Sequence, residues 1–455
     1  MLLYMAVIGK SMTSGSPWKH ILFFTLPILA GSLLQQFYHT ADTLIVGNFS
    51  GEKALSAVGA TNTLAFMLLA VAIGFSAGNG VIIAQHYGAG RENGMRSAGS
   101  SGILFLGGLG LAAGAAAIAL SRLAYKHILA VPPEILDDTV LYFQIYASGL
   151  IFQFLYNSFS AILRAVGDSA ATLYFLLIAS VVNILLDLLF VAVWHWGVAG
   201  AAAATNIAQA LSAVAAWLYM RKKYPVFRYR FKELIWDKSI IAETFRVGFP
   251  IALQLVIVAA GLTFILRAVN SFGQVMTAAF TVGQRIEMYM HLPCNALQTA
   301  LATYTGQNAG AGKLNRIKQG TLQGVMLSAG LTVIISGFAW VFASDITGWF
   351  GLSEQAAIYS TAHLQAVALT TVILSLYVPV FGVFQGVKYT IVPTVVALCA
   401  LTLRVIVTYL FKDSDIFNYS IIWWNSLFGF SLGCLITYAI YWQKSWQKTV
   451  HAVES

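Results

Sequence analysis

The sequence predicts an all-α integral membrane protein with twelve transmembrane helices in two six-helix bundles that repeat each other. Three observations predict this fold: an apolar composition, twelve long apolar segments, and a motif that recurs at a fixed offset. Hydrophobic residues make up 58% of the 455 residues, charged residues make up 9%, and the mean hydropathy is +0.76. Soluble domains carry about 25% charged residues. A soluble protein is therefore excluded.

Each apolar segment is long enough to cross a hydrocarbon core about 30 Å thick. The twelve segments span residues 21–48, 56–84, 98–121, 140–162, 170–193, 197–220, 248–270, 277–304, 321–343, 358–384, 391–411 and 420–443. The chain then divides into a cytoplasmic N-terminal segment (1–20), an N-lobe (21–220), a cytoplasmic linker (221–247), a C-lobe (248–443) and a cytoplasmic tail (444–455).

The two halves share a motif that sets their relationship. Gln-x-x-Gly-Ala-Gly begins at Gln85 and again at Gln307, and the basic and amide residues after it keep their spacing. Pro27 is matched by Pro250 at nearly the same offset. Six helices per half is an even number, so both halves start on the same side of the membrane. The repeat is therefore parallel, about an axis along the membrane normal.

The basic residues predict the orientation. Of the 26 Lys and Arg residues, four lie in the outer loops of a topology with an inside N-terminus, three lie in or beside helices, and the remaining 19 lie inside. This asymmetry places both termini in the cytoplasm, in a multi-pass protein of the plasma (inner) membrane. It also accounts for the net charge of +9 without a nucleic-acid partner.

Residues Gly74–Gly78 spell the G-x-S-x-G of serine hydrolases. That motif requires a preceding strand and a strained turn, whereas this stretch lies in the middle of a predicted span. Glycines four residues apart in a span favour close helix packing. We therefore predict packing here, with no enzyme activity and no cofactor.

Only three acids fall inside the predicted spans: Asp42, Asp187 and Glu287. An ionisable group in a membrane is costly and marks a functional site by default. Asp42 lies about 33 Å along its helix from the inner end, and Asp187 lies about 29 Å along its own. Both helices run outward, so the two carboxylates should reach a similar depth in the outer half of the N-lobe.

Three polar residues are predicted to join these acids. Asn183 is one turn from Asp187, Thr205 enters the next helix to a similar depth, and Tyr38 is one turn from Asp42. Carboxylate, amide and hydroxyl oxygens suit Na⁺, and two close carboxylates also suit a shared proton. The alternative is that each acid pairs with a structural partner, but no Lys or Arg lies within the predicted N-lobe spans.

A polar stripe marks the eighth predicted helix. Its members recur at spacings of three and four residues, which places them on one helical face. They are Gln284, Glu287, His291, Asn295 and Gln298. Such a stripe cannot face lipid and should line the central cavity. Two roles for Glu287 stay open: recognition of a cationic substrate, or a structural ion pair with Arg404 or Arg267.

These features together resemble the prokaryotic branch of the multidrug and toxic compound extrusion (MATE) family, over about residues 20–443. The matching stretches are Pro27 followed by Ala41–Thr43, the two Gln-x-x-Gly-Ala-Gly motifs, Leu163–Asp168, Asn183 to Asp187, and Gly197–Ala201 running to Thr205. The resemblance implies a V-shaped pair of bundles, alternating access, and export of amphipathic, often cationic compounds against an ion gradient. It also implies a cation site at Asp42, Asn183, Asp187 and Thr205, and a helix bend at Pro27.

One position departs from another branch of that family, which carries an essential acid in helix 7, eight residues after the proline. Here the position is Val258, and helix 7 has no acid. The departure disfavours a C-lobe coupling site of that kind and shifts the expected coupling to the N-lobe.

The sequence thus predicts a secondary active multidrug efflux transporter that exchanges small amphipathic, cationic substrates for H⁺ or Na⁺, with the lipid bilayer around it and no obligate protein partner. The alternative is a flippase for a lipid-linked precursor of the same superfamily, which a strongly basic central cavity would favour. A membrane-embedded enzyme ranks third, because no metal-ligand cluster or nucleophile–base pair is apparent.

Overall fold

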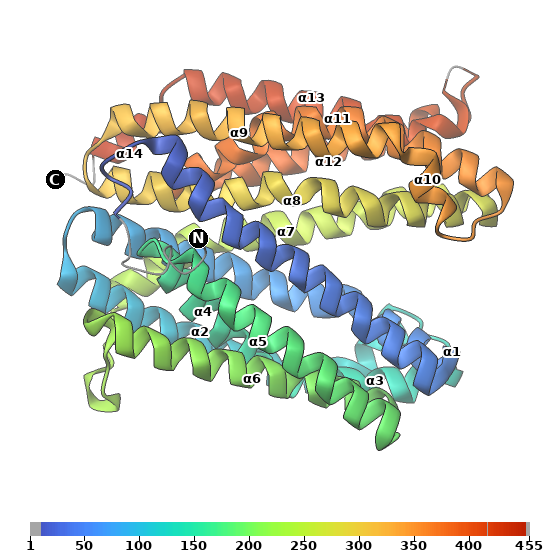
Figure 1. Cartoon of the computed structure of the whole chain (residues 1–455), viewed down its shortest axis with the longest axis horizontal. Coiled ribbons are helices and arrows are strands. Elements are labelled where there is room, and N and C mark those ends of the chain that lie inside the picture. Colours follow the sequence, from blue (N-terminus) through green and yellow to red (C-terminus); the bar gives the residue numbers. More distant parts are fainter. Residues whose placement is uncertain (1–10, 416, 452–455) are drawn as a thin grey trace. The chain divides into compact units, whose positions relative to one another are not determined.

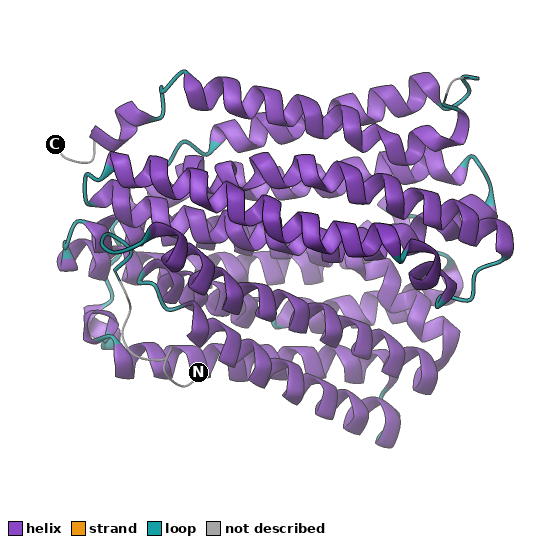
Figure 2. Cartoon of the chain, turned by 45° about the horizontal axis from the view of Figure 1, so that its top comes forward, coloured by secondary structure: helices purple, strands orange, loops and turns teal. Residues whose placement is uncertain are grey.

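The computed structural model describes residues 11–415 and 417–451, and within them the chain consists of helices and loops, with no strand (Figures 1 and 2). The helices of the first half are α1 (Pro17–Gly88), α2 (Glu92–Leu123), α3 (Pro133–Ser148), α4 (Leu150–Ala165), α5 (Ser169–Asp187) and α6 (Gly197–Lys223). Those of the second half are α7 (Lys238–Asn270), α8 (Gln274–Gly310), α9 (Leu314–Val341), α10 (Ala343–Gly348), α11 (Glu354–Gly386), α12 (Ile391–Phe411), α13 (Ile421–Trp442) and α14 (Gln447–His451).

The predicted twelve-span architecture is confirmed. Nine helices of the described chain are long and apolar enough to span a membrane, and α3 with α4, bent by 45°, makes a tenth span. The 72-residue α1 contains two spans that meet at Gly51, whose φ of 83° breaks the helix. Helix α8 is the twelfth span, and its polar stripe lowers its hydropathy.

The chain forms two compact units. Unit 1 contains Pro27–Ala252 and unit 2 contains Met12–Leu26 together with the chain from Leu253 onward. The first turns of α1 thus belong to the unit of the second half, and those of α7 to the unit of the first half. The changes of unit fall at Pro27 and close to Pro250. The lobe boundaries predicted from the sequence, 21–220 and 248–443, do not include this exchange.

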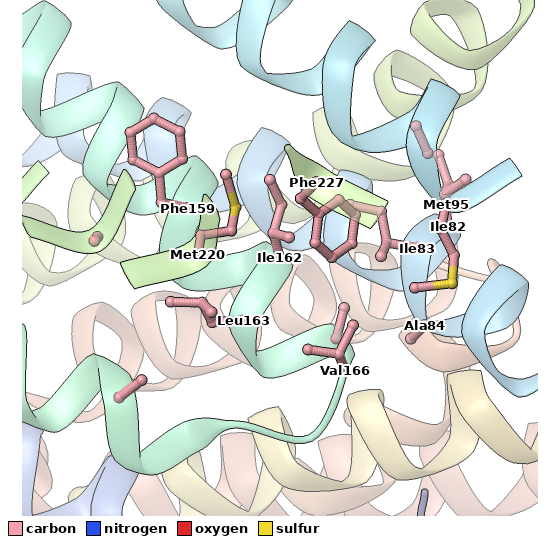
Figure 3. Close-up of a cluster of buried hydrophobic side chains, with 14 of the residues drawn as sticks. Ile82, Ile83, Ala84, Met95, Phe159, Ile162, Leu163, Val166, Met220 and Phe227 are labelled. Carbon is pink, nitrogen blue, oxygen red and sulfur yellow. The ribbon is translucent and has the colours of Figure 1, made fainter. Parts of the chain in front are cut away.

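Unit 1 is held together by small residues and an apolar cluster. The face of α6 that packs in the unit is made largely of alanines, which allow neighbouring helices to approach closely. A buried cluster joins six helices, α1, α2, α4, α5, α6 and α7, to the linker after α6 (Figure 3). Figure 3 shows Phe227 of that linker beside Ile83 and Ile162.

The glycines of the G-x-S-x-G stretch lie at a close helix contact. A Cβ atom added to Gly74 would meet the backbone nitrogen of Ala252 at 2.4 Å, and one added to Gly78 would meet that of Gly248 at 2.6 Å. Both partners lie on α7. The predicted packing role is therefore confirmed, because any side chain at these positions would displace the facing backbone.

In unit 2 the central element is α11, which packs against α8, α9, α12 and α13. The residues that precede α1 are bound to this unit. Arg316 donates hydrogen bonds from its guanidinium to the carbonyls of Met12, Ser14 and Gly15. The amide of Met12 donates to Gln307 of the second Gln-x-x-Gly-Ala-Gly motif at 2.8 Å.

The segment before α7 is held by unit 1 in a different way. Arg96 forms a 2.7 Å ion pair with Glu233, and the amide of Ile235 donates to the Ser100 hydroxyl. Asp237 then accepts from the amide of Ser239 at 2.9 Å and caps α7. The pKa of Asp237 lies below its ordinary value, mainly because the hydroxyl of Ser239 donates a hydrogen bond to its carboxylate.

Candidate functional site

The two acids predicted to converge in the first half do so. The carboxyl groups of Asp42 of α1 and Asp187 at the end of α5 are close enough to interact directly. Both are buried, with Asp187 fully removed from solvent. Two carboxylates in contact repel unless a proton or a cation lies between them, so this arrangement selects for one of these.

Asn183 and Thr205 stand beside the acid pair. The Asn183 amide donates to the Thr205 hydroxyl at 3.4 Å, and this hydroxyl donates in turn to the carbonyl of Ala201, one turn earlier on α6, at 3.1 Å. The amide nitrogen of Asn183 is therefore used in holding α5 to α6. Its carbonyl oxygen has no hydrogen-bond partner in the described chain.

Four buried oxygens at this site have no hydrogen-bond partner in the described chain. They are Oδ1 of Asp42, both carboxylate oxygens of Asp187, and Oδ1 of Asn183. Buried acceptors without donors are costly, and charged ones more so. Oxygen atoms of this kind fit Na⁺, a hard cation, and the two carboxyls also fit a shared proton. We call Asp42, Asn183, Asp187 and Thr205 the acid site.

The backbone changes from α-helix to π-helix at the acid site. The α-helical part of α5 ends at Asp187, and a π-helical turn, η3 (Leu188–Val193), follows at once. Single π-turns inside helices are frequent at functional sites, because the extra residue rotates the side chains that follow. The turn ends against Trp194 and Trp196, whose rings contact Phe190.

Tyrosines enclose the acid site, and sequence reasoning found only one of them. Tyr38 interacts electrostatically with Asp42, as predicted from their spacing. Tyr142 of α3 interacts with both Asp42 and Asp187, and its ring stacks on that of Tyr146. The sequence around Tyr142 gave no signal, because tyrosines are common near the ends of membrane spans.

The stripe on α8 brings Glu287 to two histidines. Glu287 Oε1 lies 3.6 Å from Nε2 of His291, and Glu287 Oε2 lies 4.0 Å from Nε2 of His363 on α11. The ring of His363 stacks on those of Phe280 and Trp423. Sequence reasoning missed His363, which stands alone in an apolar helix.

Neither predicted arginine forms an ion pair with Glu287 in the described chain. Arg404 donates to Asn425 at 2.8 Å and lies over the ring of Phe430, so it reaches Glu287 only at longer range. Arg267 is exposed. Within the described chain, no hydrogen bond joins the other stripe residues, Gln284, Asn295 and Gln298, to Glu287 and its two histidines. Their role in a substrate cavity stays a prediction.

A cavity of about 150 Å³ lies within unit 1, between α1, α4, α5 and α6. Pro27 is in its wall, inside α1, and the bend expected there stays a prediction. Arg164 of α4 also lines it. The expectation that no basic residue lies in the helices of this half is therefore wrong: α4 extends to Ala165, three residues beyond the predicted end at 162.

Comparison with known proteins gives a consistent result over most of the chain. The model of the MatE family matches residues 27–189 and 250–410, one segment in each half. A probable multidrug resistance protein of Bacillus subtilis, YpnP, is 30% identical over 78% of this chain and 79% of its own. A second protein of that organism, YoeA, is 26% identical over 97% of both chains. The multidrug export protein MepA of Staphylococcus haemolyticus is 24% identical over 90% of both.

Solved structures with the same fold are also found. An outward-facing multidrug resistance MATE transporter of the MOP superfamily superimposes with a TM-score of 0.90 at 20% identity, over 98% of both chains. A MOP superfamily transporter from Pyrococcus furiosus gives a TM-score of 0.89 at 20% identity, over 98% of both chains. At this identity the likeness shows the fold alone.

Proposed function

The chain belongs to the MatE family of multi-pass membrane transporters, and from this premise we propose that it is a secondary active exporter of small amphipathic cations, driven by antiport with H⁺ or Na⁺. The curated relatives named above are described as multidrug resistance or export proteins, which supports small-molecule export. The coupling ion and the charge of the substrate are parts of the proposal.

One observation carries the coupling proposal: the contact between Asp42 and Asp187, in an acid site whose acceptor oxygens lack donors within the described chain. Leaving two carboxylates in contact without a positive charge would cost several kcal/mol. Na⁺ or a proton removes that cost, so the occupancy of the acid site follows the ion concentration on the side to which the site is open. An ion gradient can therefore bias one conformation over another.

In this proposal Glu287 belongs to substrate recognition. Its carboxylate lies beside His291 and His363, and the ring of His363 stacks on Phe280 and Trp423, a setting that suits an amphipathic cation. Without an ion pair to Arg404 or Arg267 in the described residues, Glu287 remains available to a ligand. Gln284, Asn295 and Gln298 would extend the same face.

We further propose that the protein lies in the inner membrane with both termini cytoplasmic, with no cofactor beyond the coupling ion and no obligate protein partner. The distribution of Lys and Arg supports this orientation. Single cysteines in a cysteine-free background test it with an impermeant thiol reagent in sealed cells. Residue 222 should be protected and residue 134 labelled, and external labelling of residue 222 would contradict the topology.

Reconstituted protein tests the transport proposal. Proteoliposomes are loaded with ethidium, and the coupling ion is made more concentrated outside. One sample has a Na⁺ gradient at uniform pH, and the other has a pH gradient, acidic outside, without Na⁺. We expect efflux under at least one gradient and its collapse when an ionophore dissipates that gradient. Efflux that is independent of both gradients, or that requires ATP, would contradict antiport.

A further inference from the structure

The cavity in unit 1 is separate from the acid site and carries a positive charge of its own. All of its lining residues lie between Pro27 and Gln209. Part of its lining is apolar and includes Ile28, Leu69 and Leu176. The rest includes amides, hydroxyls and the guanidinium of Arg164. A cavity lined by both apolar and polar side chains fits an amphipathic ligand.

Arg164 has no carboxylate partner in the part of the chain that the structure describes. No ion pair or side-chain hydrogen bond joins it to any described residue, and Tyr156 is its one electrostatic neighbour there. The nearest acid along the chain, Asp168, is engaged elsewhere: it accepts from Lys223 at 3.0 Å and from the hydroxyls of Tyr219 and Tyr224. A half-buried guanidinium without a counter-ion favours binding of an anion.

A second unpartnered group points to a ligand in the same cavity. The side chain of Gln209 is only 9% exposed, and its carbonyl oxygen has no hydrogen-bond partner among the described residues. A buried acceptor of this kind needs a donor from a ligand or from water. Polar groups with unmet hydrogen bonds thus come from two helices, α4 and α6.

We propose that this cavity is a binding site for the anionic head group of an amphiphile, a phosphate or a carboxylate, held by the guanidinium of Arg164, with the adjoining apolar part against Ile28, Leu69 and Leu176. The planar guanidinium donates two parallel hydrogen bonds to such an anion, which a Lys ammonium cannot do. The volume of about 150 Å³ accepts a head group with a short stretch of tail or one ring, not a large drug.

The cavity is connected to the acid site through two polar contacts. Gln35 lines the cavity and interacts with Tyr38, which interacts with Asp42. Gln153 lines it too and accepts from the hydroxyl of Tyr146 at 3.0 Å. Tyr146 stacks on Tyr142, which interacts with both acids. An anion in the cavity would favour a cation at the acid site, and by linkage the reverse also holds. Binding itself does not depend on the export proposal, so either proposal can fail without the other.

Isothermal titration of the purified whole protein in a neutral detergent tests the site, with the heat of empty micelles subtracted. Four probes separate the head from the tail: octyl phosphate, octanoate, 1-octanol and inorganic phosphate. We expect octyl phosphate or octanoate to bind about tenfold or more tightly than 1-octanol, as a charge-assisted pair predicts. The one that binds more tightly identifies a lipid-like phosphate or a carboxylate as the preferred head. Inorganic phosphate, without a tail, should bind more weakly than octyl phosphate.

Variants then assign the preference to Arg164. Arg164→Gln should lose the preference for an anionic head and bind octyl phosphate no more tightly than 1-octanol. Arg164→Lys should retain part of that preference. Arg221→Gln is the matched control, because it removes a basic residue of the same half that lies over Trp217 and outside the cavity. It should bind all four probes as the native protein does.

Three results would overturn the proposal. They are equal binding of the anionic probes and 1-octanol by the native protein, a preference that survives Arg164→Gln, and binding of inorganic phosphate as tight as that of octyl phosphate. If Arg164→Gln does not fold, Ser32→Phe replaces it, since this change narrows the cavity and leaves Arg164 in place. Ser32→Phe should weaken both octyl phosphate and octanoate, and unchanged binding would overturn the proposal.

Discussion

Unit 1 and unit 2 share a repeated scaffold but hold their buried acids in opposite ways. In unit 1, Asp42 and Asp187 face each other, and no basic side chain of the described chain pairs with them. In unit 2, Glu287 stands between His291 and His363. The repeat thus keeps its turn motif and its proline while the ionisable groups differ.

One pair of positions shows the divergence most directly. Arg404 lies 221 residues after Asn183, which is the offset of the repeat in that region. Asn183 contributes an uncharged oxygen to the acid site, whereas Arg404 brings a permanent positive charge near Glu287. The acid site has no such basic residue beside its two carboxylates within the described chain. The comparison therefore supports the proposal that ion coupling belongs to unit 1.

The largest effect is expected at the acid site. Asp42→Asn and Asp187→Asn should each abolish gradient-driven efflux in proteoliposomes, because an amide neither binds Na⁺ tightly nor exchanges a proton. The folded protein should persist with an unchanged or raised melting temperature, since each change removes a buried charge. Asp138→Asn is the matched control, because Asp138 pairs with Lys53 at 3.2 Å away from the acid site. Near-normal transport by either variant would place coupling elsewhere.

A smaller effect is expected in unit 2. Glu287→Gln should weaken export of cationic substrates by about tenfold, equivalent to about 1.4 kcal/mol, and spare neutral ones. Its melting temperature should change little, because no ion pair to Arg404 or Arg267 is lost among the described residues. The measurement is efflux of a cationic and a neutral substrate from the same vesicles. Loss of folded protein, partly restored by also replacing Arg404, would instead support a structural pair.

The first turns of α7 belong to unit 1, where they pack closely against α1. A single added methyl group should disturb this contact. Gly78→Ala would place a Cβ atom 2.6 Å from the backbone of Gly248, so it should destabilise the protein by about 1–3 kcal/mol. Gly59→Ala is the matched control on the same helix, since its added Cβ would meet nothing within 4 Å. Thermal melting in detergent should separate the two variants. Equal melting temperatures would contradict the close contact between α1 and α7.

The smallest effect is expected at the start of α7. Asp237→Ala should cost about 1 kcal/mol, because it removes the cap of that helix. The folded pKa of Asp237 is lowered, so the cap stabilises the protein above the ordinary carboxyl pKa of 3.8 and is lost as the pH falls through the lower folded value. Melting temperatures at pH 7 and pH 3 measure this. If the melting temperatures of Asp237→Ala and the native protein differ as much at pH 3 as at pH 7, the capping role of Asp237 is contradicted.

The sequence was sufficient for the spans and for the depth of the acids. A rise of about 1.5 Å per residue places Asp42 and Asp187 at one level, and the structure brings them into contact. The same count gives no direction around the helix axis. It therefore could not show that Tyr142 faces the acid site or that His363 faces Glu287. Neighbours across helices follow from packing, which a single sequence does not specify.

Helix ends were the other source of error. Apolar runs end where polar residues begin, but α4 continues past the predicted 162 and takes Arg164 with it. Polar residues that face a cavity have no need to leave a helix, so hydropathy ended this helix too early. The two predicted spans of α1 meet at Gly51, whose φ of 83° breaks the helix, so the connection between them is short.

Equilibrium binding of ²²Na⁺, with proton release measured in the same weakly buffered sample, tests the assignment of coupling to unit 1 most directly. The native protein should bind Na⁺ or exchange a proton at one saturable site. The double variant Asp42→Asn/Asp187→Asn should lose that site, and Glu287→Gln should retain it. A site that survives in the double variant and disappears in Glu287→Gln would contradict the account.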